Sequence, residues 1–180
     1  MIHRREGCRR VDDHNRDFLV RQPLHVYSLA PRMLYNLFLW QLLCPQATES
    51  APNNAMAFVA SSMSKGRLAY WSKDNKTKIL LAKQAQDDVV TALSLDPSND
   101  LAHHLMGRWH FEMAQLNFVV RGLVRVLYGT SLIPGSVPEA LASYTRAAEL
   151  NPGRLVHRVE VGRMCERLGM HEDALRHLKV

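Results

Sequence analysis

Nine histidines are the first candidates for chemistry in this chain, because imidazole serves both as a general base and as a metal ligand. His103, His104 and His110 fall close together on one predicted helix. They form no HExxH motif and have no carboxylate at metal-ligand spacing. His103 and His110 occupy positions at which helical repeats place packing side chains, and His171 and His177 do not share a helix face. The sequence therefore predicts no metal site.

Cys165 is the candidate nucleophile, with His157 or His171 as its base. Its position in the pattern described below faces inward, which predicts a buried thiol of low reactivity. Glycine-rich phosphate loops are missing as well, because GMHEDA and NPGR have neither the spacing nor a preceding strand. We therefore predict no catalytic residues, no cofactor and no enzyme activity.

Positive charge offers a binding hypothesis. Arg108 and Arg163 each follow a glycine in two similar helices, so we expect both side chains to point along a groove. His104 lies one turn before Arg108, and Arg167 lies one turn after Arg163. These four residues, here called the basic stripe, would bind an acidic protein segment through charge-assisted hydrogen bonds. The alternative is internal pairing of the arginines with acidic neighbours, namely Glu112, Glu160 or Glu166.

The overall charge is compatible with an acidic partner but does not show whether that partner is a nucleic acid, an anionic lipid or a protein. The chain has 23 basic and 17 acidic side chains, which give a net charge of +6. A recognition-helix motif, a dense Lys/Arg run and an aromatic stacking platform are all missing, so no nucleic-acid partner is expected. The three cysteines form no CxxC pair, which favours a reducing compartment.

The N-terminal part, residues 1–52, is arginine-rich and is predicted to be poorly structured. Its one apolar run, MLYNLFLWQLLC at residues 33–44, predicts a short helix. A spanning helix needs about 20 apolar residues, so this segment is expected to contact a core or a membrane surface without crossing it.

An internal repeat organises the rest of the chain. ALSLDPSNDLAHHLMGR, residues 92–108, aligns without a gap on AAELNPGRLVHRVEVGR, residues 147–163, at an offset of 55. Matches include Ala92 with Ala147, Pro97 with Pro152, and Gly107 with Gly162. Small residues that let two helices approach, followed by a proline that ends the hairpin, are typical of tetratricopeptide units.

The predicted fold is therefore an all-α, tetratricopeptide-like solenoid of helical hairpins over residues 53–180, with an incomplete last repeat. The hairpins are expected at about 54–97, 98–152 and 153–180. The middle one contains a 21-residue insertion, because Gly107 and Ala140 are much further apart than the pattern requires.

The insertion sequence is apolar, so we expect the preceding helix to continue through it from Asp100 to Tyr128 and to pack on neighbours or on a partner. Ser98 or Asn99 is the expected cap of this helix. Three further capping residues are predicted elsewhere: Asn75 for the helix before it, and Ser136 with Glu139 as a capping box for the helix after it.

The run from Ser72 to Gly153 resembles the regulator of microtubule dynamics family. Two blocks carry the resemblance, AHHLMGRWHFEMAQL and PEALASYTRAAELNPG, together with the insertion between them. The likeness covers about residues 65–178 and does not extend to residues 1–52. Further helices of the family would follow Leu178, so we expect the last repeat to be truncated and the face of Leu175 and Leu178 to lack a cover.

The resemblance implies a non-enzymatic scaffold that associates with microtubules and spindle poles. Tubulin or another acidic protein surface would then be its partner, and the cytoplasmic microtubule cytoskeleton its location. Some relatives in this family sit on mitochondria and tether membranes. A membrane-contact or lipid-handling adaptor is therefore the alternative function.

Overall fold

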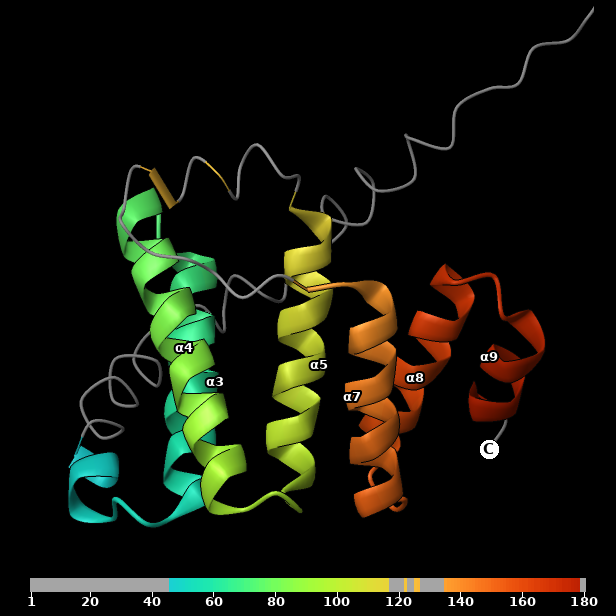
Figure 1. The fold of residues 1–180 in the computed structure, drawn as a ribbon, viewed down its shortest axis with the longest axis horizontal. Helices are drawn as coiled ribbons and strands as arrows, with labels where there is room; N and C mark the ends of the chain where they lie inside the picture. The colour runs from blue at the N-terminus through green and yellow to red at the C-terminus, as the bar shows by residue number, and fades with distance from the viewer. Residues whose placement is uncertain (1–45, 117–121, 123–124, 127–134, 179–180) are drawn as a thin grey trace, which may run out of the picture. The chain divides into compact units, whose positions relative to one another are not determined.

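The computed structural model describes residues 46–116, 122, 125–126 and 135–178, and every regular element in these ranges is an α-helix. The chain divides into two units, and the described helices belong to the second, Leu37–Val180. Residues 46–50 are helical, whereas the rest of the predicted N-terminal segment, including the apolar run at 33–44, lies outside the described residues. The longer helices appear in Figure 1: α3 (Ala55–Trp71), α4 (Asn75–Leu95), α5 (Asp100–Gln115), α7 (Val137–Leu150), α8 (Leu155–Arg167) and α9 (His171–Leu178).

Polar caps fix where α3, α5 and α7 begin. Asn54 accepts a hydrogen bond from the Met56 N–H at 2.9 Å, and Asn99 accepts one from the Ala102 N–H at 3.0 Å. Each bond satisfies a backbone donor that the first turn of a helix leaves free. The predicted cap of α7 is confirmed, because Ser136 Oγ accepts from its N3 N–H at 3.3 Å.

The cap of α4 differs from the prediction, because it is Asp74 and not Asn75. The Asp74 carboxylate accepts hydrogen bonds from the N–H of Thr77 at 2.8 Å and of Lys76 at 3.4 Å. A carboxylate offers two acceptor oxygens, and its negative charge is favourable at a helix N-terminus. The hydroxyl of Thr77 also donates to it, and these bonds lower the pKa of Asp74.

Helix α5 ends at Gln115, so the prediction of one helix from Asp100 to Tyr128 is wrong. Leu116 has an extended backbone (φ −77°, ψ 123°), and its N–H bonds to the carbonyl of Met113, which tightens the last turn. The next residue in the sequence is Asn117, a type that forms helices poorly. The apolar composition of the insertion led us to predict that the helix continues, but composition alone does not show where a helix ends. Helical backbone is described again at residues 122, 125 and 126.

The helices pair along the chain as hairpins, α3 with α4, α5 with α7, and α8 with α9 (Figure 1). In the second and third hairpins a glycine faces a large side chain. A Cβ atom added at Gly107 would lie 2.9 Å from the Tyr144 ring, and one at Gly162 would lie 2.8 Å from Leu178. These are the glycines that the internal repeat aligns, and in each hairpin they bring the two helices together.

Small residues also fill the buried core. One cluster joins α3, α4 and α5, and it consists of Ala55, Val59, Ala92 and Ala102. The other joins α7, α8 and α9, and it consists of Ala140, Tyr144, Val161, Met164, Cys165 and Ala174. Alanine permits short distances between helices, as repeat stacking requires. The predicted all-α hairpin architecture is confirmed.

Candidate functional site

His104 lies at a polar contact between α5 and α8. Its Nδ1 is 3.0 Å from Nδ1 of His157, whose Nε2 is 2.9 Å from Oδ2 of Asp100. Nε of Arg154 is 2.8 Å from the same carboxylate oxygen. We call these four residues, Asp100, His104, Arg154 and His157, the polar junction. It joins the second hairpin to the third.

The hydrogen-bond partners fix the proton positions when both histidines are neutral. A carboxylate can only accept, so the Nε2–H of His157 donates to Asp100. The Nδ1 atom of His157 then accepts a hydrogen bond from the Nδ1–H of His104. His157 is completely buried, and this arrangement satisfies both of its ring nitrogens.

The charge state of the polar junction follows from its surroundings. The pKa of His104 is lowered to about 4, chiefly by burial and then by the positive charges of His157, Arg108 and Arg154. His104 is therefore neutral at pH 7 and adds no positive charge to the basic stripe. Burial acts to raise the pKa of Asp100, but the hydrogen bond from His157 and the charge of Arg154 outweigh it, so that this pKa is lowered.

Arg108 on α5 and Arg163 on α8 are both exposed. Burial raises the pKa of Tyr144, whereas the charges of these two arginines lower it. Nη1 of Arg163 is 2.7 Å from Oε1 of Glu160, so one of the internal pairs left open by the sequence is present. Among the described residues, Arg108 forms no ion pair.

Arg167 is also exposed, and it stacks on α5. Its guanidinium carbon lies 5.0 Å from the centroid of the Phe111 ring, which is a cation–π arrangement. The structure thus places Arg108, Arg163 and Arg167 on α5 and α8, whereas His104 belongs to the contact between these helices.

The remaining candidates for catalysis or metal binding lie in separate contacts. Cys165 is 2% exposed, which confirms that the thiol is buried, and burial raises the pKa of this thiol. His103 Nε2 lies 2.9 Å from the carbonyl of Pro97, and His110 Nδ1 lies 3.6 Å from the carboxylate of Glu139. In the described ranges, no three His, Cys, Asp or Glu side chains are arranged to hold a metal ion.

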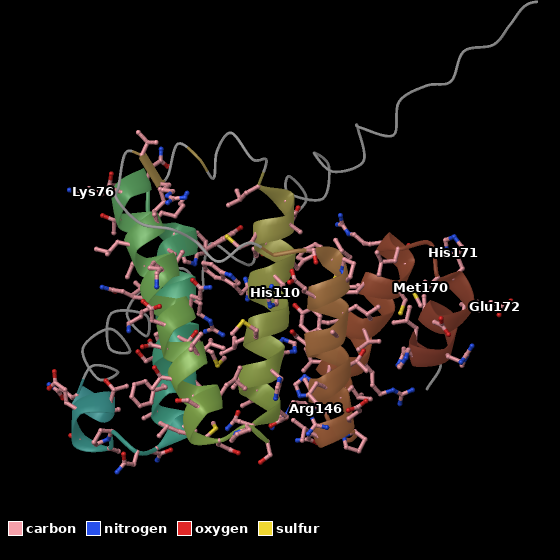
Figure 2. The ribbon with its side chains drawn as sticks, in the orientation of Figure 1. Lys76, His110, Arg146, Met170, His171 and Glu172 are labelled. Carbon is pink, nitrogen blue, oxygen red and sulfur yellow. The ribbon has the colours of Figure 1, made fainter. Side chains whose placement is uncertain are left out.

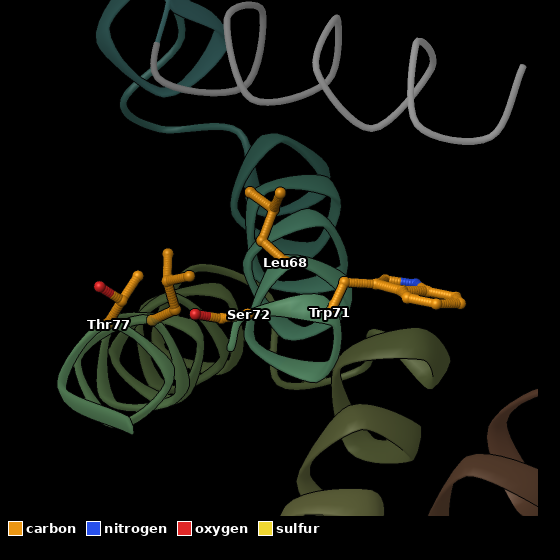
Figure 3. Close-up of a pocket in the computed structure, with 5 residues that line it drawn as sticks. Leu68, Trp71, Ser72 and Thr77 are labelled. Atoms are coloured by element: carbon orange, nitrogen blue, oxygen red, sulfur yellow. The ribbon is translucent and has the colours of Figure 1, made fainter. Parts of the chain in front are cut away.

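A hollow of about 260 Å³ lies at the turn between α3 and α4. Figure 3 shows its lining, in which Trp71 points away from Thr77. The walls are mostly apolar and include the hydroxyl groups of Ser72 and Thr77. The lining residues are Leu68, Trp71, Ser72, Thr77 and Leu81. None of the residues of the basic stripe lines it, so it is separate from the predicted binding residues.

The polar junction escaped the sequence analysis, although the internal repeat contains its signal. His157 aligns with Ala102, while Asp100 and His104 align with Leu155 and Val159 at the offset of 55. A polar residue whose repeat counterpart is apolar and buried needs a polar partner. His157 meets this condition, because Ala102 is buried, whereas Leu155 and Val159 are partly exposed. The repeat thus predicts a buried polar contact at His157 but does not identify Asp100 and His104 as its partners.

Comparison with known proteins supports the fold. A thermophilic TPR protein from Thermus thermophilus is similar in structure, with a TM-score of 0.54 over 89% of this chain and 73% of that chain. The two sequences are 18% identical, so the likeness concerns the fold alone. It identifies the stacked hairpins as tetratricopeptide-like, as predicted.

Comparison of sequences identifies the family. "Regulator of microtubule dynamics protein 3" of Mus musculus is 29% identical over 96 residues, which are 53% of this chain and 20% of that protein. "Regulator of microtubule dynamics protein 1" of Bos taurus is 33% identical over 78 residues, which are 43% of this chain and 24% of that protein. The match thus spans about a quarter or less of either relative. The family profile "Regulator of microtubule dynamics protein 1-3" matches residues 42–180, and the chain belongs to this family.

Proposed function

We propose that this chain is a non-enzymatic protein-interaction scaffold that associates with microtubules. The observation that carries the proposal is the exposure of Arg108 and Arg163 at equivalent positions of two repeats, with Arg167 one turn further along α8. Recurrent arginines suit the acidic surface of tubulin, because complementary charge guides association. The relatives' names connect the family with microtubule dynamics.

The binding segment would be residues 53–180, and the site would be the basic stripe reduced to its three arginines. The ion pair between Arg163 and Glu160 joins neighbouring turns of one exposed helix, so it is weak and an acidic partner can replace it. We place the protein on the cytoplasmic microtubule cytoskeleton, including the spindle. Neither a nucleic-acid partner nor a cofactor belongs to this proposal.

Microtubule co-sedimentation of the whole chain tests this proposal. We expect Arg108→Glu/Arg163→Glu to weaken pelleting about tenfold at low ionic strength, and added salt to weaken pelleting of the unchanged chain. The matched control is Arg146→Glu/Arg176→Glu, which changes the charge equally at two exposed arginines on α7 and α9. The proposal fails if both double variants pellet alike, or if the unchanged chain does not pellet at low salt.

A membrane-contact function has one observation in its favour. Tyr70 and Trp71 are 68% and 60% exposed at the end of α3. Lys73 follows them in the turn, and Lys76 lies in the first turn of α4. Aromatic and lysine side chains together suit an anionic membrane surface, and mitochondrial association would belong to this alternative. No helix in the described ranges is long and apolar enough to cross a membrane. Flotation with anionic liposomes that is lost in Trp71→Ala would favour this function over tubulin binding.

A further inference from the structure

The end of the first hairpin carries an excess of positive charge. Between residues 65 and 83 the chain has six basic side chains and one acidic one, Asp74, whose carboxylate caps α4. Lys65 and Lys83 pair with aspartates of α4. The other four are exposed and form no ion pair within the described ranges; we call them the hairpin cations, Arg67, Lys73, Lys76 and Lys78. Figure 2 shows Lys76 where α4 begins, at this end of the hairpin.

The hairpin cations lie beside the mostly apolar hollow at the turn between α3 and α4. Arg67 lies one helical turn before Trp71 on α3, and Lys78 lies one turn before Leu81 on α4. Lys73 lies in the turn itself. Residues three or four apart on a helix are neighbours on its surface, so these cations flank residues that line the hollow. The hollow thus has apolar walls and a positively charged rim.

An exposed aromatic ring forms one wall of this hollow. Trp71 is 60% exposed, although it lines the hollow. The Tyr70 ring contacts it edge to face, with 5.4 Å between the ring centroids, and this contact restrains the indole. The volume of about 260 Å³ is smaller than the roughly 300–1,000 Å³ of a typical small-molecule site. The hollow therefore suits one side chain of a larger ligand.

Charge narrows the choice of that ligand. Residues 1–32 of the chain have seven basic and four acidic side chains, and residues 33–44 have no charged side chain. Neither segment complements the positive rim, and the net charge of +6 opposes a second copy. The headgroup region of a membrane would contact the protruding side chains but would leave the recess between the two helices unfilled. An acidic protein segment with an apolar side chain complements both the rim and the recess.

We propose that this hollow binds an acidic segment of a partner protein. One aromatic or branched aliphatic side chain of that segment enters the hollow and covers the exposed ring of Trp71. Acidic residues on either side of it pair with the hairpin cations through charge-assisted hydrogen bonds. Because no residue of the basic stripe lines the hollow, this site is separate from the proposed microtubule site.

A labelled synthetic peptide, in which acidic residues flank one phenylalanine on both sides, serves as the probe. Fluorescence anisotropy measures its binding to the whole chain. One control peptide has serine in place of the phenylalanine, and the other has the amides Asn and Gln in place of the acidic residues. We expect each control to bind about tenfold more weakly at low ionic strength, because the first lacks the apolar contact and the second lacks the charge.

Variants of the chain locate the peptide. Lys73→Glu/Lys78→Glu should weaken its binding about tenfold, and Trp71→Ala should have a similar effect. All three positions are exposed, so these substitutions leave the core intact. A peptide with a photo-crosslinker in place of the phenylalanine should label α3 or α4 of the unchanged chain. This measurement does not depend on the folding of any variant.

The matched control is Arg146→Glu/Arg176→Glu, which makes the same change of charge on α7 and α9 and should leave binding unchanged. Figure 2 shows Arg146 on α7, away from Lys76. The proposal is wrong if either control peptide binds as tightly as the acidic peptide, or if crosslinks are confined to other helices. It is also wrong if this control weakens binding as much as Lys73→Glu/Lys78→Glu.

Two further results would assign the hollow to another occupant. Vesicles of phosphatidylserine and phosphatidylcholine that bind the unchanged chain but not Trp71→Ala, together with no binding of the acidic peptide, would assign it to a membrane. A photo-crosslinker in place of Trp71 that joins, without peptide, to residues 1–45 or to a second copy would assign it to the chain itself. None of these measurements involves tubulin, so failure here is distinguishable from failure of the proposed microtubule function.

Discussion

Asp100 takes part in three interactions at once. It lies in the first turn of α5, where a negative charge is favourable, and its Oδ2 accepts from both His157 and Arg154. Its side chain is only 19% exposed, so water can replace these partners only in part. A neutral residue here leaves the completely buried His157 without its charged acceptor.

We therefore expect Asp100→Asn to lower the free energy of unfolding by roughly 2 kcal/mol, the range for a buried hydrogen bond to a charged group. Urea unfolding followed by circular dichroism measures this change. The matched control is Asp87→Asn, since Asp87 forms an exposed ion pair with Lys83 and should change stability by less than about 0.5 kcal/mol. Equal effects of the two substitutions would show that the polar junction contributes no more than a surface ion pair.

Gly107 and Gly162 each face a large side chain of the paired helix, and these two side chains differ in how easily they could move to admit a Cβ atom. Tyr144, opposite Gly107, is 2% exposed and is held by an edge-to-face contact with His104 at 5.0 Å between ring centroids. Leu178, opposite Gly162, is 46% exposed and has a flexible side chain. The same added methyl group should therefore have different consequences at the two positions.

We expect Gly107→Ala to destabilise the protein by about 1–3 kcal/mol, because the Tyr144 ring cannot move without disturbing the core. Gly162→Ala should cost less than about 0.5 kcal/mol, because Leu178 can shift and alanine favours the helix by up to about 1 kcal/mol. Thermal unfolding of both variants tests the difference. A larger loss at Gly162 would contradict this account of the hairpins.

At this scale the sequence was informative wherever structure depends on neighbouring residues. The beginnings of α5 and α7 could be predicted because the capping side chain and the backbone N–H that donates to it lie within three residues. The end of α5 could not, because the apolar residues beyond Gln115 continue the helical pattern without marking the extended backbone at Leu116. The polar junction was missed because Asp100 and His157 are far apart in the sequence, and each alone resembles a surface residue.

The second and third hairpins should separate on acidification more readily than the first and second. His104 has a pKa of about 4 in the folded protein against 6.5 when unfolded, so its stabilising contribution is complete above pH 6.5 and is lost as the pH falls toward 4. His104 contacts His157 and the ring of Tyr144, and the charges of Arg108, Arg154 and Asp100 act on it. The pKa of Asp100 is lowered, so its own contribution is complete above pH 3.8 and losses between pH 7 and pH 5 do not come from Asp100.

Hydrogen exchange at pH 7 and pH 5, corrected for the intrinsic exchange rate, measures this effect. We expect the protection of α8 and α9 to fall at pH 5 while that of α3 and α4 changes little, since the contact between α3 and α5 is apolar. His104→Gln keeps a hydrogen-bond donor but does not titrate, and it should remove most of the difference. Equal losses in all three hairpins would contradict the prediction.

The first and second hairpins meet through apolar side chains, whereas the second and third meet through polar ones. This difference limits how such a chain could lengthen by duplication of a hairpin. A copied third hairpin placed directly after the first would bury His157 against Ala55 and Val59, where no carboxylate is available. A copied second hairpin placed after itself would bring Ala102 against Asp100 and His104, and would leave those polar groups without the partners that α8 now supplies. These contacts therefore fix the order of the hairpins. A new copy can stack only after its contact residue changes polarity to match its neighbour, from polar to apolar at His157 or from apolar to polar at Ala102.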